Sequence, residues 1–275
     1  MAIFDDLVEQ YHPITDDARE SAQREVMQKI ALAGLNRGGF FEHAAFYGGT
    51  CLRIFHGLNR FSEDMDFSLI EKDSNVHIEN YFQPIVDEFR AIGMPVEIAK
   101  KDKKAFGRVE SAFLKEDTEA YDIKFQTRKM LKVKIELDTN PPLQFSTEQR
   151  LLMQPYSFSV RIFTLPDLYA GKMHALVYRA WQRRIKGRDW YDFEWYVRNG
   201  IALDFNHLQA RIKEFSGEDL NQDQFMEQLR NKLATSDIDN VKQDVLPYIS
   251  HEQRRELDFW SNDYFLQLAD MIKFG

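Results

Sequence analysis

A glycine turn that follows an apolar run constrains this chain more than any other feature of its sequence. Residues 40–47 are aromatic and apolar enough to form a buried strand. Gly48 and Gly49 come next, and a glycine pair permits a sharp turn in which the backbone approaches a ligand closely. Thr50 can cap a helix after the turn, and the exposed N–H groups at a helix start favour an anion such as a phosphate. The pattern therefore predicts a strand, a turn and a helix around a site for an anion.

Two aspartates follow this turn. Asp64 and Asp66 come after Thr50 with thirteen residues between Thr50 and Asp64, and their spacing of two makes both side chains point the same way on a strand. Neighbouring carboxylates repel each other unless a cation lies between them. Hard oxygen ligands of this kind suit Mg²⁺, which is usually shared with substrate phosphates. A glycine turn beside a solvated acidic loop is the simpler interpretation, but the combination of both motifs favours a metal and phosphate site.

The combined motif resembles the signature of the DNA polymerase beta-like nucleotidyltransferase superfamily. That signature consists of Gly-Gly-Ser/Thr, a helix, and then Asp-x-Asp/Glu on a strand. The fuller form here adds Leu52 and Arg53 after the turn and Arg60-Phe61-Ser62-Glu63 before the aspartates. This form resembles one branch of the superfamily, the AbiEii/AbiGii-type nucleotidyltransferase toxins of bacterial toxin–antitoxin systems. The resemblance covers residues 48–192 through four motifs in the expected order.

The resemblance implies an enzyme that transfers a nucleotide from an NTP and releases pyrophosphate. The glycine turn is implied to cradle the triphosphate, and Asp64, Asp66 and Glu136 to hold Mg²⁺ or Mn²⁺. The nucleotide-binding residues that the resemblance implies are Gly48, Gly49, Thr50, Arg53, Lys134, Lys172, Arg188 and Asp192. The catalytic residues that it implies are Asp64, Asp66, Glu136, Lys172 and Asp189.

The third carboxylate of the metal site is expected on a strand at residues 131–138. Charged and apolar residues alternate there, so one face of the strand is apolar and the other is charged. The pair Lys134-x-Glu136 resembles the second motif of the toxin family and favours Glu136, with Asp138 on the same face as the alternative. Such a carboxylate can complete a metal site or accept a proton from an attacking hydroxyl. An exposed strand face with unrelated charges would show the same alternation.

A strong helix start introduces the third motif. Thr164 can cap the helix, Pro166 stands in its first turn, and the acidic Asp167 follows. The spacing from Asp167 to Lys172 resembles the third motif of the family. A lysine at this position can neutralise the β- and γ-phosphates of a nucleoside triphosphate. By composition alone, a lysine on a helix is usually only solvated.

The fourth motif follows a basic segment. Five basic residues fall within residues 179–188, and Gly187 is predicted to end one helix before Arg188 and Asp189 begin another. Arg188-Asp189-x-x-Asp192 resembles the fourth family motif, and Asp189 is favoured over Asp192 as the site residue. Asp189 can cap the new helix while it bonds to a basic neighbour, and Asp192 falls on the same side one turn later. A helix junction held by Arg–Asp pairs is the structural alternative.

The basic segment also predicts a nucleic-acid contact. Guanidinium groups match phosphate geometry, so the segment can receive a triphosphate or an RNA backbone. We expect RNA contacts at Arg183, Arg184 and Lys186. The family resemblance implies a toxin that adds nucleotides to the 3′ end of tRNA, with a cognate antitoxin as its partner.

Composition limits the environment and the partners of the chain. The net charge of −8 argues against general coating of nucleic acid, and no DNA partner is expected, although a local basic patch is allowed. The single cysteine, Cys51, excludes an internal disulfide framework and fits a reducing cytoplasm. Neither a signal peptide nor an apolar stretch of about 18 residues is apparent, so no membrane contact is expected.

The element pattern predicts an α+β protein, a nucleotidyltransferase-like mixed sheet with flanking helices followed by helices. We expect a nucleotidyltransferase core at 1–164 and a helical domain at 165–275 that closes the active-site cleft. An irregular arm is expected at 1–14, and a helix capped by Asp17 and Glu20 after it. Further helices are expected at 75–92 and, four in number, over 203–273. The remaining strands are expected at 64–70, 95–100, 107–115, 120–126 and, at the sheet edge, 157–164.

Two other functions remain open at this point. One is nucleotide transfer to a small molecule or to a protein hydroxyl, which the acidic net charge favours slightly. The other is a non-catalytic protein that binds a nucleotide or an antitoxin. We expect Lys172→Ala or Asp66→Ala to abolish transfer without unfolding the protein.

Overall fold

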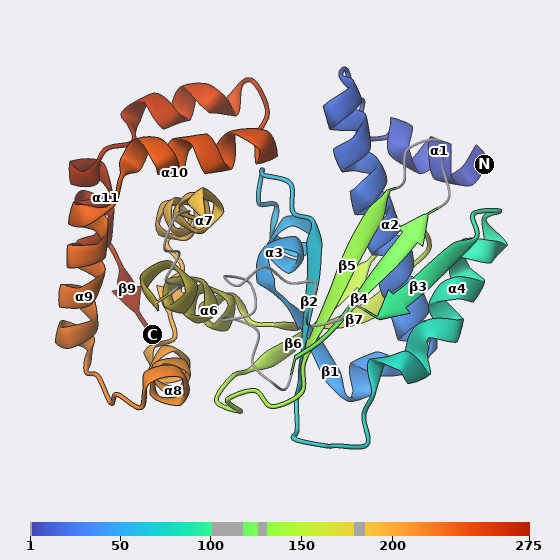
Figure 1. Ribbon diagram of the computed structural model, residues 1–275, viewed down its shortest axis with the longest axis horizontal. Coiled ribbons are helices and arrows are strands. Elements are labelled where there is room, and N and C mark those ends of the chain that lie inside the picture. Colours follow the sequence, from blue (N-terminus) through green and yellow to red (C-terminus); the bar gives the residue numbers. More distant parts are fainter. Residues whose placement is uncertain (1, 101–117, 126–130, 179–184) are drawn as a thin grey trace. The chain divides into compact units, whose positions relative to one another are not determined.

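The computed structural model describes residues 2–100, 118–125, 131–178 and 185–275 (Figure 1). The predicted strand at 107–115 and the predicted RNA contacts Arg183 and Arg184 lie outside these residues. The chain divides into two compact units. The first unit comprises Met1–His56, Phe61–Pro141 and Thr147–Ile162, and the second comprises Gly57–Arg60, Pro142–Ser146 and Phe163–Gly275.

A seven-stranded sheet with the order β3-β4-β5-β2-β1-β7-β6 organises the first unit (Figure 1). The strands are β1 Ala44–Tyr47, β2 Asp64–Leu69, β3 Val96–Lys100, β4 Thr118–Phe125, β5 Lys132–Asp138, β6 Thr147–Leu152 and β7 Phe158–Phe163. β2 pairs with β5 in parallel and with β1 in antiparallel orientation, so the sheet is mixed. This mixed sheet with its helices confirms the predicted α+β class.

The helices of the first unit correct two predictions near the N-terminus. They are α1 Ala2–Glu9, α2 Asp16–Arg37, α3 Gly48–His56 and α4 Phe82–Ala91, with 3₁₀ helices at η1 Phe40–Glu42 and η2 Ile78–Tyr81. The expected irregular arm is wrong, because α1 buries Phe4 and Val8. The expected Asp17 cap is also wrong, since Thr15 Oγ1 accepts the Ala18 N–H and α2 begins at Asp16, two residues earlier than an Asp17 cap implies.

The predicted edge strand is wrong in its position. β7 lies inside the sheet, between β1 and β6, and β6 forms the edge. β6 escaped prediction because three consecutive residues on it, 149–151, are exposed, so it shows no alternation. A polar, solvent-facing sequence is how edge strands commonly avoid further pairing, and it hides them from a search for apolar patterns.

Aromatic packing fixes β2 in the first unit. The ring of Phe67 lies 5.3 Å from that of Phe40 and 5.0 Å from that of Phe46, measured between centroids. All three side chains are completely buried. Because side chains alternate along a strand, burial of Met65 and Phe67 directs Asp64 and Asp66 to the opposite face. The core therefore determines the direction of both aspartates.

His56, the last residue of α3, predicts a loss of stability in acid. Burial and, to a smaller extent, Arg150 together lower the pKa of His56 to about 4, against an opposing effect of Glu148. As the pH falls, the His56 imidazole is therefore protonated near pH 6.5 in the unfolded chain but only near pH 4 in the folded chain. Stability is complete above about pH 6.5 and is lost as the pH falls towards about 4. After allowance for solvent screening of this partly buried group, the loss is about 1–2 kcal/mol.

Urea unfolding at pH 7 and pH 4.5 tests this expectation. The variant His56→Gln carries no titrating ring, so its unfolding free energy should fall less than that of the wild type between the two pH values. An equal fall in both proteins would remove His56 from the acid sensitivity.

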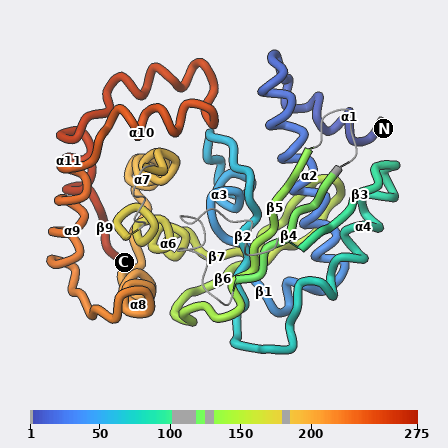
Figure 2. Tube along the Cα trace, in the orientation of Figure 1, coloured from blue at the N-terminus to red at the C-terminus, as the bar shows by residue number. Residues whose placement is uncertain are grey.

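The second unit consists mainly of helices. They are α6 Leu165–Tyr178, α7 Gly187–Arg198, α8 Phe205–Ser216, α9 Gln222–Thr235, α10 Ile238–Val245 and α11 Asn262–Ala269, with 3₁₀ helices at η4 Leu246–Tyr248 and η5 Gln253–Phe259. The four α-helices predicted over 203–273 are confirmed. A short parallel pair, β8 Ala202–Leu203 and β9 Lys273–Phe274, was not predicted. β9 is labelled near the C-terminus in Figure 2.

Polar caps explain where these helices begin. Asp204, Asn221, Asp237 and Ser261 precede α8, α9, α10 and α11, and each side chain accepts a backbone N–H of the first turn. In the part of the chain that the structure describes, no helix has the length and apolar character needed to cross a membrane.

Candidate active site

The sheet register brings three carboxylates to one face of the first unit. In the parallel pairing of β2 with β5, Asp66 lies opposite Glu136, and Asp64 lies opposite Lys134. Residues opposite each other on neighbouring strands point to the same face, as do residues two apart. Asp64, Asp66 and Glu136 therefore form one acidic cluster, with Lys134 beside it. All four side chains are partly accessible, so a ligand can reach them.

Lys134 reports the charge of the acidic cluster. Its Nζ lies 2.5 Å from Glu136 Oε1. Burial alone would lower the pKa of Lys134, but the carboxylates of Glu136, Asp64 and Asp66 outweigh burial and raise it. The lysine therefore stays protonated and partly offsets the repulsion among three acids. A small hard cation fits the same donor set, because Mg²⁺ and Mn²⁺ prefer carboxylate oxygens.

The geometry favours Glu136 over Asp138 as the third carboxylate. Asp138 points to the same face but lies opposite Ser68, two residue pairs further along the strands. Its side chain is buried, and Oδ1 accepts the backbone N–H of Asn140 at 3.1 Å. Asp138 thus stabilises the turn after β5, whereas Glu136 lies directly beside Asp66.

Gly48 brings the turn against the carboxylate of Asp66. Tyr47 is paired with Asp66 across β1 and β2, and Gly48 follows with a φ of +82°. A Cβ atom at Gly48 would overlap Oδ2 of Asp66. Both the left-handed backbone and the close approach require glycine here.

We expect Gly48→Ala to reduce transfer about a hundredfold. The added methyl group must displace the Asp66 carboxylate, and a shift of about 1 Å at a reacting group can cost two orders of magnitude. Pyrophosphate release measures the effect, and circular dichroism checks the fold.

Gly57→Ala is the matched control. Gly57 has a similar φ of +75°, but no described atom lies within 4 Å of the position of a Cβ. This variant imposes the same backbone strain without contact at the acidic cluster, so its transfer rate should stay near that of the wild type. Equal losses in both variants would assign the effect to backbone strain.

Thr50 makes a different backbone contact from the predicted helix cap. The prediction that Thr50 caps the helix is wrong, because α3 already begins at Gly48. Its side chain is fully buried, and its hydroxyl donates a hydrogen bond to the backbone carbonyl of Asp64. This hydrogen bond joins the first turn of α3 to the start of β2. Gly49 lies beside it in that first turn, where helix N–H groups are free to bind an anion.

Arg53 extends from α3 towards α2. Its Nε donates to Oε2 of Glu25 at 2.9 Å, and its guanidinium lies 4.5 Å from the centre of the Phe61 ring. These contacts give Arg53 a structural role that the sequence did not indicate.

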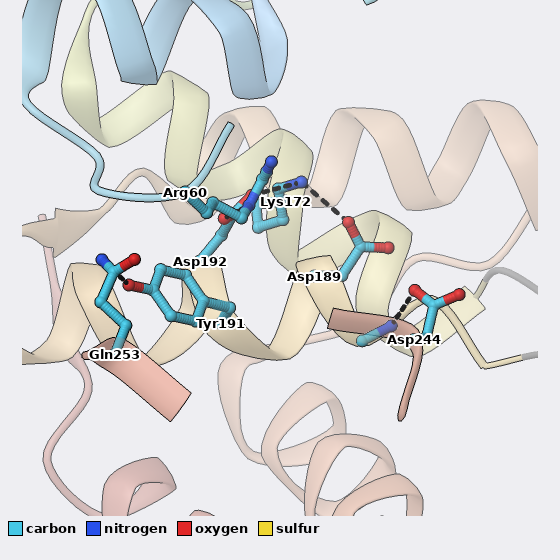
Figure 3. A network of polar contacts seen from close by, with 8 residues as sticks. Arg60, Lys172, Asp189, Tyr191, Asp192, Asp244 and Gln253 are labelled. Atoms are coloured by element: carbon cyan, nitrogen blue, oxygen red, sulfur yellow. Dashed lines mark hydrogen bonds and ion pairs between the residues drawn. The ribbon is translucent and has the colours of Figure 1, made fainter. Parts of the chain in front are cut away.

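The second unit holds a separate group of buried charges around Lys172. Lys172 Nζ lies 2.8 Å from Oδ1 of Asp189 and 2.8 Å from Oδ2 of Asp192 (Figure 3). Lys172 comes from α6, and both aspartates come from α7, where a spacing of three places them on one side. The aspartate side chains are 3% and 0% exposed, and that of Lys172 is 14% exposed. The structure thus unites the third and fourth sequence motifs.

Arg60 completes this group and carried no assigned role in the sequence prediction. Its Nε lies 2.5 Å from Asp192 Oδ1, and its Nη2 lies 2.6 Å from Oδ2, which is a two-pronged ion pair (Figure 3). Burial would raise the pKa of Asp192, but Arg60 and Lys172 outweigh burial and hold it below its usual range. The only sequence signal for Arg60 is its place at the head of the Arg-Phe-Ser-Glu-Asp motif. We call Arg60, Lys172, Asp189 and Asp192 the buried charge group.

The start of α7 differs from the prediction. Gly187 was expected to end a helix, but it is the first residue of α7. Its N–H donates to Asp244 Oδ2 at 2.8 Å, and a Cβ atom there would overlap the carbonyl oxygen of Val241 on α10. Asp189 therefore does not cap α7, although its predicted bond to a basic neighbour is present through Lys172. Arg188 lies over the ring of Tyr248, 4.1 Å from its centre.

Lys186 is the one predicted RNA contact within the described residues. It stands directly before α7, in the N-cap position, and its side chain makes no capping bond. It is partly accessible, so a contact with a phosphate is sterically open.

Asp167 stabilises the fold within the second unit. Its Oδ2 accepts the Thr164 hydroxyl at 2.5 Å and the Ser146 N–H at 3.1 Å, which agrees with the predicted helix start. Its Oδ1 lies 2.9 Å from Nδ1 of His207. The Asp167 side chain is 1% exposed and that of Lys172 is 14% exposed, so Lys172 is the more accessible member of the third motif.

A second acidic group was not predicted. Ligand atoms of His77, Glu79 and Glu119 lie within 4.8 Å of one another in the first unit. Lys100 Nζ already pairs with Glu79 at 3.2 Å, which competes with a cation. This group includes a histidine, whereas the acidic cluster on β2 and β5 consists of carboxylates, the ligand type that Mg²⁺ prefers.

Comparison with known proteins matches this arrangement to a family. A family model described as "Nucleotidyl transferase AbiEii toxin, Type IV TA system" matches residues 30–267. The chain belongs to this family. As an AbiEii-family protein it is a nucleotidyltransferase, and the toxin–antitoxin context predicted from its motifs is confirmed at family level.

Solved structures agree with the AbiEii-family fold. MenT4, a nucleotidyltransferase toxin from Mycobacterium tuberculosis H37Rv, is 15% identical with a TM-score of 0.58, over 97% of this chain and 93% of that one. A candidate nucleotidyltransferase from H. pylori is 18% identical with a TM-score of 0.53, over 91% of this chain and 92% of that one. At these identities the likeness concerns the fold alone. No curated protein sequence matches the chain significantly.

Proposed function

We propose that this AbiEii-family enzyme transfers a nucleotide from an NTP to the 3′ end of a tRNA in the presence of Mg²⁺ or Mn²⁺. The observation that carries the proposal is the register of β2 and β5, which places Asp66 opposite Glu136 and Asp64 on the same face. Three carboxylates in one cluster suit a metal-dependent phosphoryl reaction. The basic residues of 179–188 and the family membership support an RNA acceptor.

Asp64, Asp66 and Glu136 are the residues that would hold the metal. When bound, Mg²⁺ neutralises the phosphates of the NTP and favours the deprotonated acceptor hydroxyl. Lys134 offsets part of the negative charge of the cluster, because its Nζ contacts Glu136. Thr50 positions Asp64 through the hydrogen bond to its backbone carbonyl.

The chain supplies groups for each part of the reaction. The acceptor hydroxyl oxygen bonds to the α-phosphorus, the bond from that phosphorus to the bridging oxygen breaks, and pyrophosphate leaves. Glu136 is placed to accept the hydroxyl proton, either directly or through one water. The N–H groups of Gly48 and Gly49 bind phosphate oxygens at the start of α3.

The buried charge group supplies positive charge for the triphosphate. Lys172 has three N–H donors, and two of them point to Asp189 and Asp192 in the contacts of the described residues. The third is available for a β- or γ-phosphate oxygen. Arg188, whose guanidinium lies over the Tyr248 ring, is a second candidate, because a guanidinium matches phosphate geometry. Asp189 and Asp192 act by holding Lys172.

An RNA-labelling experiment tests the proposed function. The protein is incubated with Mg²⁺, total bacterial RNA and each α-³²P-labelled NTP in turn, and the products are separated on a denaturing gel. We expect label in bands of tRNA size with a preferred NTP, and none when EDTA replaces Mg²⁺. The variant Asp66→Asn serves as the matched inactive protein.

Other outcomes assign a different acceptor. The net charge of −8 favours a small molecule or a protein hydroxyl over a long nucleic acid. Pyrophosphate release with a metabolite or protein extract, without label in RNA, would support that acceptor and overturn the tRNA proposal. Absence of pyrophosphate under every condition would overturn the proposed reaction for the isolated chain.

The toxin–antitoxin context adds a partner. We propose a cognate antitoxin and, because tRNA is the acceptor, action in the cytoplasm. Co-purification of the chain with the product of an adjacent gene, followed by loss of RNA labelling on addition of that product, would support the pairing.

A further inference from the structure

We propose that Arg60 and Asp192 are positioning residues that hold the Lys172 ammonium in its working place. The inference rests on the proposed role of Lys172 at the triphosphate, but its main test does not require activity. Arg60 binds both carboxylate oxygens of Asp192, and the completely buried Asp192 carboxylate in turn contacts Lys172. Both therefore act through Lys172 and not on the substrate.

The geometry around Asp192 explains why an arginine is used. A guanidinium binds both oxygens of one carboxylate and so fixes its plane, whereas an ammonium is a point charge. Arg60 bonds Oδ1 and Oδ2 of Asp192 at 2.5 and 2.6 Å. With that plane fixed, Oδ2 also meets Lys172 Nζ at 2.8 Å. Asp189 provides the second anchor at 2.8 Å, so Lys172 is held from two sides.

The charge balance points the same way. Two cations and two carboxylates meet in the buried charge group, so its net charge is zero. Removal of Arg60 alone would leave two carboxylates for one lysine and would pull the ammonium deeper into the group. Removal of Asp192 alone would leave Arg60 and Lys172 as neighbouring like charges. Either change alters the direction in which Lys172 can donate its third N–H.

Arg60 lies in a chain segment that belongs to the second unit although it comes early in the sequence. The compact unit that contains α6 and α7 includes Gly57–Arg60, although this segment stands between α3 and β2 in the sequence. Arg60 precedes the metal-site residue Asp64 by four positions. The segment that leads into the Asp64-x-Asp66 motif thus contributes one residue to the group that holds Lys172.

A purely structural ion pair is the competing explanation, and a double variant separates the two. Replacing both partners of a buried ion pair restores much of the stability that is lost when only one partner is removed. Arg60→Met combined with Asp192→Asn keeps the side-chain volumes and the net charge. We expect its urea midpoint to lie closer to the wild type than that of either single variant. The anchoring of Lys172 by a fixed carboxylate, however, stays lost.

The rate at which a reagent modifies the Lys172 amine measures directly how firmly Asp189 and Asp192 hold it. The proteins are treated briefly with an acetylating reagent at fixed pH, and acetylation of Lys172 is followed by peptide mass spectrometry. We expect acetylation in the double variant to be about tenfold faster than in the wild type, as the loss of one charge-assisted hydrogen bond implies. The control Arg198→Gln removes ion pairs with Glu194 and Glu256 in the same unit and should leave Lys172 labelling unchanged.

Kinetics provide the second readout. In the double variant the KM for the NTP should rise about tenfold, with a further fall in kcat, whereas Arg60→Lys should recover part of both. Wild-type labelling and wild-type KM in a folded double variant would overturn the proposal. If the wild type itself releases no pyrophosphate, the proposed function fails, and the labelling rates still decide whether Arg60 and Asp192 position Lys172.

Discussion

Replacing Asp66 with asparagine is expected to reduce nucleotide transfer on the order of a thousandfold. The amide has the shape of the carboxylate but lacks its charge, so it cannot balance a divalent cation at the centre of the acidic cluster. Asp66 occupies that centre because it lies opposite Glu136 on one side, opposite Tyr47 on the other, and against Gly48. No other side chain in the first unit has this combination of neighbours among the described residues.

The Asp66 variant should stay folded. The change is isosteric, and it reduces repulsion within a cluster of three carboxylates, so the unfolding free energy should remain within about 0.5 kcal/mol of the wild type. Pyrophosphate release and urea unfolding measure the two effects. Asp87→Asn on α4 is the control, since it removes an exposed carboxylate that pairs with Arg90. Wild-type transfer by the Asp66 variant would remove the cluster from the mechanism.

Lys172→Met is expected to abolish detectable transfer and also to destabilise the protein by about 3–5 kcal/mol. The sequence alone suggested that removing Lys172 would leave the fold intact. The structure leads to a different expectation, because the lysine lies between Asp189 and Asp192, whose side chains are 3% and 0% exposed. Without the ammonium, both buried carboxylates lose the cation that they share.

Urea unfolding of Lys172→Met tests the stability effect. Lys213→Met is the control, because Lys213 pairs with Asp219 on the surface at 3.2 Å and both side chains are more than 60% exposed. A surface pair of this kind contributes about 0–1 kcal/mol, so the control should behave like the wild type. Equal stabilities for the two variants would mean that the buried charge group is not essential to the fold. Transfer by Lys172→Met is measured without urea, on protein that circular dichroism shows to be folded.

The acidic cluster could be predicted largely from the sequence because its determinants are local. The alternation of β2 buries Met65 and Phe67 and leaves Asp64 and Asp66 on one face, which a period of two already implies. The alternation of β5 gives Glu136 and Asp138 a common face in the same way. Only the pairing of the strands places Glu136, and not Asp138, opposite Asp66.

The buried charge group could be predicted only in part because it depends on contacts between distant segments. Lys172 and Asp189 were candidates through their motifs, but their bond joins residues 17 positions apart on two helices. Arg60 and Asp192 are 132 positions apart, and no local sequence pattern predicts an ion pair between residues so distant in the chain. The role of Thr50 was missed for a related reason, because a hydroxyl near a turn can equally cap a helix or bond to a neighbouring strand.

The second unit is built from separate segments of the chain, and this limits how the protein can be cut into fragments or combined with a relative. That unit takes in Gly57–Arg60 as well as the stretch after Ile162, so its ion pair spans two separate parts of the gene. A fragment starting at Phe163 would carry Asp192 without its arginine. A chimera that joined the front of one family member to the back of another would have to match both partners of the pair. Natural exchange of C-terminal halves between such toxins should therefore be tolerated only in two cases. Either residues 60 and 192 come from the same parent protein, or both parents carry the same residues at these positions.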